Sequence, residues 1–228
     1  MVFCSETFKI LYLENPKCGS GSIRNFLKYT FVKDIRILQH IVENKTKYDD
    51  YHSNIKQTKE ICCNLNLEFD NYFSFTTIRN PWAKMVSLYH YDRPDKNGFS
   101  WYLENKLYDS TSAFTHDFNY WIKNIDSKKF FNINNFAFEN NIQQVTKIYP
   151  IETFTIKELC DDITEFHEKN NLGIPHFDFD IHMKLSITNT TEHKHYSSYY
   201  SKESIEIVRN LFAKDIELGN YVFEEIYF

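Results

Sequence analysis

The chain passes twice from a short β-prone segment through a loop into an amphipathic helix, and this repeated pattern limits its possible folds most. Phe8–Leu13 is apolar and β-prone, and the turn-rich loop Asn15–Ser22 follows it. Apolar residues then recur at helical spacing over Ile23–Phe31. Tyr72–Ile78, dense in aromatic and β-branched residues, leads in the same way into a helix over Trp82–Tyr91. Strands that alternate with helices predict an α/β protein.

The remaining segments fit the same class. Alternation over Met1–Leu13 as a whole indicates a strand, and the apolar tail Tyr221–Phe228 is expected to pack back on the domain. A further strand is predicted over Lys147–Phe154. Apolar periodicity predicts four further helices, over Ser53–Leu65, Phe114–Ile125, Ile156–Lys169 and Ser201–Leu218. We therefore predict a three-layer α/β/α fold with a mostly parallel central sheet, formed by a single domain over residues 1–228.

Length, charge and cysteine content exclude several classes of protein. A chain of 228 residues fits one domain, and its net charge of −5 argues against a protein that binds duplex nucleic acid. No apolar run approaches the roughly 20 residues that cross a bilayer, and the N-terminus lacks a secretion signal, so we expect a cytoplasmic protein. Five cysteines without a C-x-x-C motif argue against a disulfide framework and a zinc site.

The first loop has the composition of a phosphate- or sulfate-binding loop. Lys17-Cys18-Gly19-Ser20-Gly21-Ser22 stands directly before a helix, whose N-terminus offers free N–H groups and a partial positive charge. Glycines let the backbone approach an anion closely, Lys17 adds a mobile charge, and the serines add hydroxyl donors. The lysine precedes the glycines, so this P-loop-like segment is not a Walker A motif, and G-x-G-x-x-G is absent. A tight turn that merely requires glycine is the alternative.

The second junction carries an arginine where a strand ends. Arg79 leaves Tyr72–Ile78, and Ser87 follows eight residues later, two turns into the next helix. A guanidinium group binds phosphate through two parallel hydrogen bonds. Because ligands of open α/β sheets bind outside the carboxyl ends of the strands, we expect both loops at that edge.

With these residues the chain resembles the sulfotransferases that use 3′-phosphoadenylyl sulfate (PAPS). Pro16–Ile23 is similar to the family's 5′-phosphosulfate loop, P-K-x-G-[ST]-[ST]-S, and Phe75–Tyr89 resembles its 3′-phosphate segment, R-N-P-x-x-R-x-x-S. Asn189–Tyr196, with short stretches up to Phe223, resembles the C-terminal end of the carbohydrate sulfotransferase branch. The three stretches occur in the family's order, and the resemblance spans most of the chain.

Three positions depart from that pattern or are peculiar to this chain. Gly21 stands where the family has Ser or Thr, so one hydroxyl donor is missing, and Lys84 replaces an arginine of the second segment. Cys18 lies beside Lys17 and before a helix, which predicts a partly ionised, reactive thiol; an inert cysteine that fills a small buried space is the alternative.

The resemblance implies in-line attack of an acceptor hydroxyl on the donor's sulfur, without a metal. Lys17 would stabilise charge on the leaving phosphate, and Arg79 with Ser87 would hold the 3′-phosphate. A basic C-terminal loop would cover the donor. The implied donor contacts are Lys17, Cys18, Gly19, Ser20, Gly21, Ser22, Arg79, Ser87, Thr191 and Lys194.

A general base must accept the proton of the acceptor hydroxyl. The family uses His or Glu, and our first choice is His52, in Tyr51-His52-Ser53 at a predicted helix start. A solvated histidine at a helix start is the alternative interpretation, and His116 is the second candidate for the base.

Aromatic residues make up 18% of the chain, and most of them are expected in the core. Some could line an acceptor cleft, because sugar rings stack on aromatic faces. Trp101 and Tyr102, in a polar segment after Gly98, are the preferred candidates, and Trp82, Tyr89 and Tyr91 are the others.

The sequence therefore predicts a PAPS-dependent sulfotransferase that acts on a small-molecule hydroxyl acceptor, with a carbohydrate as the expected class. A catalytically degenerate module that binds a nucleotide or glycan without turnover is the alternative, supported by Gly21 and the open identity of the base. A nucleotide or sugar kinase is disfavoured, since the Walker A lysine and an acidic magnesium partner are missing.

Overall fold

The computed structural model describes residues 2–30, 34–38, 53–91, 117–125, 132–173, 177 and 193–225. The chain divides into two compact units. The first comprises Met1–Ile78 and Asn134–Asn189, and the second comprises Arg79–Ile133 and Thr190–Phe228. A single domain over residues 1–228 stays a prediction.

The first unit is built on a five-stranded sheet in the order β3-β1-β2-β4-β7. β2, β4 and β7 run parallel, whereas β1 is antiparallel to both β2 and β3. All strands except β1 therefore run in one direction, which confirms the predicted mostly parallel sheet. The strands are β1 (Val2–Ser5), β2 (Ile10–Leu13), β3 (Arg36–Ile37), β4 (Phe73–Ile78) and β7 (Lys147–Pro150).

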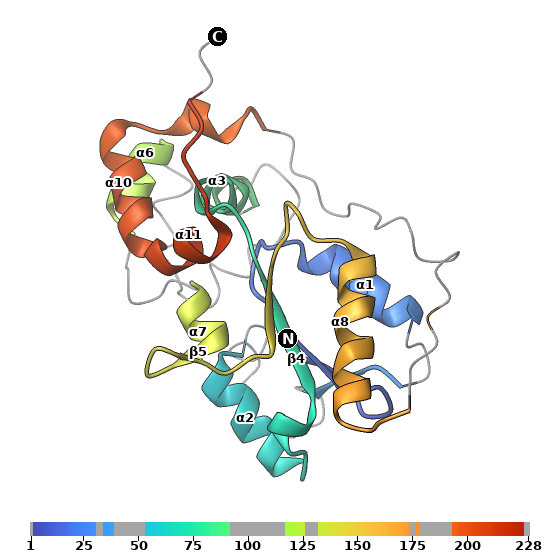
Figure 1. The fold of residues 1–228 in the computed structure, drawn as a ribbon. Helices are drawn as coiled ribbons and strands as arrows, with labels where there is room; N and C mark the ends of the chain where they lie inside the picture. Colours follow the sequence, from blue (N-terminus) through green and yellow to red (C-terminus); the bar gives the residue numbers. More distant parts are fainter. Residues whose placement is uncertain are drawn as a thin grey trace. The chain divides into compact units, whose positions relative to one another are not determined.

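Both faces of this sheet are covered. Every residue of β1, β2 and β4 is buried, although successive side chains of a strand point to opposite faces. α1 (Ser20–Thr30) and α8 (Ile156–Lys169) supply apolar residues to the core on one face. Figure 1 shows α2 (Ile55–Asn64) on the other side of β4. The predicted α/β fold with helices on both sides of the sheet is confirmed.

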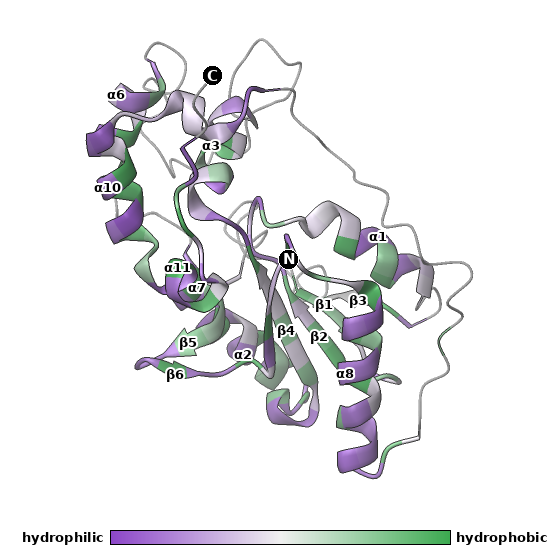
Figure 2. Cartoon of the chain, turned by 45° about the horizontal axis from the view of Figure 1, so that its top comes forward, coloured by the Kyte–Doolittle hydropathy of each residue, from purple (hydrophilic) through white to green (hydrophobic). Residues whose placement is uncertain are grey.

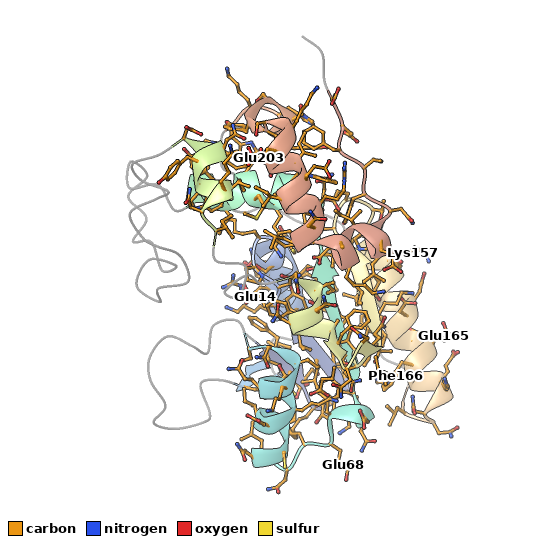
Figure 3. All side chains as sticks on the ribbon, turned by 90° about the vertical axis from the view of Figure 1, so that its left-hand side faces the viewer. Glu14, Glu68, Lys157, Glu165, Phe166 and Glu203 are labelled. Carbon is orange, nitrogen blue, oxygen red and sulfur yellow. The ribbon has the colours of Figure 1, made fainter. Side chains whose placement is uncertain are left out.

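The helix α8 shows how amphipathicity fixes this arrangement. Hydrophobic colours gather on the strands and polar colours on the outer turns of α8 in Figure 2. Phe166 packs against Phe73 with ring centroids 5.8 Å apart, whereas the neighbouring Glu165 is exposed. Figure 3 labels both side chains on α8. Smaller elements complete the unit: η2 (Phe69–Asn71), α7 (Ile133–Ala137, which begins on the last residue of the second unit) and the hairpin β5 (Phe138–Glu139) with β6 (Ile142–Gln143).

The second unit is helical in the residues that are described. Its helices are α3 (Pro81–Tyr91), α6 (Phe118–Lys123), α10 (Lys202–Leu211) and α11 (Ala213–Gly219), with the short η4 (Tyr196–Tyr199). Trp82, Trp121 and Phe212 are buried in its core. The tail packs back as predicted, since Phe223 lies edge-on to Trp82 with centroids 5.5 Å apart.

Two predicted elements are divided in the structure. Met1–Leu13 is not one strand but the antiparallel pair β1 and β2, because Lys9 has a φ of 49° and the Ser5 hydroxyl accepts a hydrogen bond from the Phe8 N–H at 3.1 Å. Ser201–Leu218 is not one helix but α10 and α11, which meet at the buried Phe212 with φ −118° and ψ 28°.

Two further elements are shorter than predicted. The helix expected from Phe114 begins only at Phe118, because Asp117 has extended backbone angles and its side chain accepts from the Tyr120 N–H at 3.0 Å. The strand expected over Lys147–Phe154 ends at Pro150, where the Pro150 carbonyl accepts from the Phe154 N–H at 2.9 Å and closes a turn.

Candidate functional site

The loop between β2 and α1 bends through two residues in the left-handed region. Lys17 has a φ of 60° and Gly19 a φ of 75°. Glycine adopts such angles freely, whereas a left-handed lysine costs on the order of 1 kcal/mol. A residue keeps such a conformation only where its surroundings impose it. The backbone of this loop is therefore fixed by its neighbours rather than by its own preference.

Gly19 is required both by its backbone angle and by its surroundings. A Cβ atom at Gly19 would lie 2.7 Å from both Cγ1 and Cδ1 of Ile151, which is closer than carbon atoms approach. Gly19 also precedes the first residue of α1, and its carbonyl accepts from the N–H groups of Ser22 at 3.1 Å and Ile23 at 3.3 Å. Because Gly19 has no side chain, it offers no side-chain acceptor to the N–H groups of Ser20 and Gly21, the first two residues of α1.

Two hydrogen bonds to Thr77 of β4 fix the position of this loop. The Thr77 hydroxyl donates to the Cys18 carbonyl at 2.8 Å, and the Asn15 amide donates to the Thr77 carbonyl at 2.9 Å. Both bonds are buried, and β2 and β4 are parallel neighbours, so their carboxyl ends lie at one edge of the sheet. Sequence reasoning missed Asn15 and Thr77, because 62 positions separate them along the chain.

A buried carboxylate lies at the start of the loop. Glu14, which is labelled in Figure 3, is 3% exposed, and its Oε1 lies 3.3 Å from Nη2 of Arg24 on α1. A buried negative charge would repel an incoming anion, and the Arg24 guanidinium offsets it. The pair therefore weakens the repulsion that Glu14 would exert on an anion at this loop.

The helix that follows β4 begins differently. The Asn80 side chain accepts from the N–H groups of Trp82 at 3.1 Å and Ala83 at 3.2 Å, and Pro81 occupies the first helical position. An asparagine cap and a proline without an N–H satisfy the start of α3 internally. An anion at this junction would therefore meet side chains, chiefly the partly buried Arg79, rather than the backbone.

Lys84 does not take the position of a phosphate ligand. It is 2% exposed, and its ammonium group lies 5.3 Å from the ring centroid of Phe212. Asp215, three residues after Phe212, is fully buried and accepts from the Ile133 N–H at 3.0 Å. The Lys84 charge, at the position where the family pattern has an arginine, thus lies in the core of the second unit.

Burial dominates the chemistry of Asp215. It raises the pKa of this carboxyl above its ordinary value of 3.8, and the Lys84 charge and the Ile133 N–H offset part of that shift. The described residues offer no hydrogen-bond partner to its Oδ1. Asp215 and Lys84 therefore form a buried polar pair in the core of the second unit.

The predicted donor contacts fall into three groups. Lys17–Ser22 form one continuous loop and helix start in the first unit. Arg79 lies two residues before α3 and Ser87 lies in the middle of this helix, where it is 6% exposed. Lys194 is exposed and belongs, like α3, to the second unit. Thr191, the base candidates His52 and His116, and the aromatic candidates Trp101 and Tyr102 lie outside the described residues.

Two aromatic candidates are excluded from an acceptor cleft. Trp82 is 1% exposed, and its indole N–H donates to the Ile205 carbonyl at 3.2 Å. Tyr89 is buried against Phe118 and Trp121. Both are core residues of the second unit, and nothing is described of the Tyr91 side chain.

The Cys18 side chain is buried, which contradicts the prediction of a reactive thiol and favours the inert alternative. Over the described part of the chain, no group of three or more His, Cys, Asp or Glu side chains is arranged to hold a metal ion. In the same residues, no helix combines the length and apolar character of a membrane span.

Comparison with known proteins gives one family. A sequence profile described as the sulfotransferase family matches residues 1–222. No curated protein matches the chain significantly, and no solved structure does. The match includes all three groups of predicted donor contacts.

Proposed function

The chain belongs to the sulfotransferase family, and on this premise we propose that it transfers the sulfuryl group of PAPS to a hydroxyl of a carbohydrate. The observation that carries the proposal is the start of α1, where Lys17 and Gly19 are left-handed and the glycine offers no side-chain acceptor to the N–H groups of Ser20 and Gly21. The donor supplies an activated sulfuryl group on its 5′-phosphate, and the residues of the chain bind and orient it.

The first loop suits the phosphosulfate end of the donor. Backbone N–H groups of α1 and the hydroxyls of Ser20 and Ser22 would donate to its oxygens, and Lys17 would neutralise charge on the phosphate that leaves. The Arg24 guanidinium offsets the charge of Glu14 and so weakens its repulsion of the donor.

The second segment suits the 3′-phosphate of the donor. Arg79, two residues before α3, supplies a planar guanidinium group, and Ser87 on α3 supplies a hydroxyl. Since Asn80 occupies the N–H groups at the start of α3, we assign this phosphate to side chains alone.

The reaction then follows from these assignments. The acceptor oxygen forms a bond to sulfur while the bond between sulfur and the bridging oxygen of the 5′-phosphate breaks, and adenosine 3′,5′-bisphosphate leaves with that bond's electrons. A general base takes the proton of the acceptor hydroxyl, and His52 remains our candidate, with His116 second. Positioning and charge stabilisation provide the catalysis, as in phosphoryl transfer.

The alternative is a degenerate module that binds the donor without turnover. Gly21, in the first turn of α1, lacks the hydroxyl that the family pattern places there, and this residue is the observation that favours the alternative. In the described part of the chain, the other residues of the loop follow the family pattern.

Radiolabelled PAPS distinguishes the two. The chain is incubated with sulfur-labelled donor and a panel of mono- and oligosaccharides, and label in the sugar fraction supports transfer. A Lys17→Ala variant is the matched control and should lose the label. Donor binding without transfer or donor hydrolysis would favour the degenerate module, and absence of donor binding would overturn both.

A further inference from the structure

One stripe of α3 is more accessible than the rest of the helix. Ala83 and His90 are partly exposed, whereas the other described side chains from Pro81 to Tyr89 are buried. Ser87 lies between them in the i, i+4, i+7 series, so these three side chains share one face of the helix. Any ligand that reaches Ser87 therefore approaches along this stripe, which ends at His90.

A second segment of the same unit covers the end of this stripe. The rings of His90 and His193 are stacked, with centroids 5.4 Å apart and an interplanar angle of 17°. Tyr199 lies edge-on to both rings, 5.2 Å from His90 and 6.5 Å from His193. The three rings join the C-terminal end of α3 to a segment more than 100 positions later in the chain.

Hydrogen bonds within the segment transmit this attachment to Lys194. The His193 Nδ1 lies 2.8 Å from the Lys194 carbonyl, and since a carbonyl only accepts, Nδ1 carries the hydrogen. The Lys194 N–H donates to the Tyr199 hydroxyl at 3.3 Å. The backbone of Lys194 is thus bonded to His193 and to Tyr199, which both contact His90, and its side chain is exposed.

We propose that the His90–His193 stack is a positioning device that holds Lys194 at the Ser87 face of α3, so that the Lys194 ammonium adds a second cation to the 3′-phosphate site. This inference rests on the proposed function. It makes His90 and His193 positioning residues, because they act through Lys194 rather than on the phosphate. It also explains how a segment far away in sequence can belong to the same site as Arg79 and Ser87.

Calorimetric titration with adenosine 3′,5′-bisphosphate and with AMP tests the proposal. Lys194→Ala and His193→Ala should each weaken bisphosphate binding about tenfold, the loss of one charge-assisted contact, and leave AMP binding unchanged. The double variant should lose no more than either single variant, because both changes remove the same contact. His193→Phe retains a flat ring for stacking but loses the hydrogen bond to the Lys194 carbonyl, so its affinity should lie between those of His193→Ala and the parent.

His195→Ala is the matched control. His195 belongs to the same segment, but its ring lies against Tyr196, with centroids 4.4 Å apart, rather than against His90. Its Nδ1 accepts from the Ser197 N–H at 3.4 Å and caps η4, so we expect a loss of stability while bisphosphate affinity stays within twofold of the parent's. Additive losses in the double variant, or equal losses for bisphosphate and AMP, would overturn the positioning role.

The experiment separates this inference from the proposed function. A parent protein that binds bisphosphate no better than AMP contradicts the assignment of the 3′-phosphate to Arg79 and Ser87. A parent that prefers the bisphosphate, with His193→Ala and Lys194→Ala indistinguishable from it, overturns only the role of the histidine stack.

Discussion

α1 begins behind a glycine, whereas α3 begins behind an asparagine whose side chain binds two of the helix's first N–H groups. Both helices follow parallel, adjacent strands of one sheet, β2 and β4. The two junctions thus share a topology but differ in what they can offer an anion. At α1 the preceding glycine offers no side-chain acceptor to the N–H groups of Ser20 and Gly21, whereas at α3 the Asn80 side chain already binds those of Trp82 and Ala83.

This difference explains why the two segments use different residue types. A backbone site needs glycine and an imposed loop conformation, which Gly19, Ile151 and Thr77 provide. A side-chain site needs an arginine and a rigid helix, which Arg79 and the buried face of α3 provide. We therefore expect substitutions at the two junctions to fail in different ways.

The largest effect is expected from Arg79→Ala. Loss of a charged, bidentate contact costs about 2–5 kcal/mol, so bisphosphate affinity should fall at least thirtyfold while AMP affinity changes little. Calorimetry of both ligands provides the measurement, and Arg79→Lys is the control that keeps the charge but not the planar fork. Equal losses for the two ligands would remove the distinction between the two phosphate sites.

Gly19→Ala should damage the α1 junction through its backbone. The added Cβ meets Ile151 at 2.7 Å and stands on a φ of 75°, so we expect a loss of about 1–3 kcal/mol in the free energy of unfolding. Urea unfolding measures it. Gly173→Ala is the matched control, because nothing lies within 4 Å of a Cβ there, and a comparable loss in that variant would refute the explanation.

Asn80→Ala should affect stability rather than the open anion site. It removes the acceptor for two N–H groups of α3, which typically lowers the free energy of unfolding by about 1 kcal/mol. Asn80→Asp should restore most of the loss, since aspartate caps helices equally well. An alanine variant as stable as the parent would show that the cap contributes nothing to α3.

The smallest effect is a change in the pH dependence of stability from Asp215→Asn. Burial raises the folded-state pKa of Asp215 above 3.8, so its contribution is fully present below that pH and is lost as pH rises through the folded-state pKa. The free energy of unfolding of the Asn variant should lack this decline with pH. A constant loss of stability, from the loss of a charged partner for Lys84, does not affect this comparison of slopes. Urea unfolding across that pH range measures the slopes, and parallel curves for the two proteins would contradict the assignment.

Local patterns predicted the parts of the fold that depend on local interactions. The two junctions and α8 follow from apolar spacing over a few turns, and the predicted α8 matches Ile156–Lys169. The two-residue β3 carries too little pattern to be recognised, and it forms because β1 offers it a hydrogen-bonding edge. The break at Phe212 likewise depends on what the ring and Asp215 meet in the core.

The candidate site divides in the same way. Lys17, Gly19, Arg79 and Ser87 stand out in the sequence because a short motif contains them. The asparagine cap had a signal in the sequence, since Asn80 precedes a proline and a helix. Burial of Lys84 had none, because lysine is rarely buried without a partner that only the fold supplies. The His90–His193 stack joins residues too far apart for any local pattern.

We expect a phosphate group to bind the backbone at the start of α1 but only side chains at the start of α3. Amide nitrogen–proton NMR spectra of the isotope-labelled chain, titrated with adenosine 3′,5′-bisphosphate, test it most directly. We predict large shifts for the amides of Ser20 and Gly21, and small shifts for those of Trp82 and Ala83, which stay bonded to Asn80. Large shifts at Trp82 and Ala83, with Ser20 and Gly21 unchanged, would contradict this assignment.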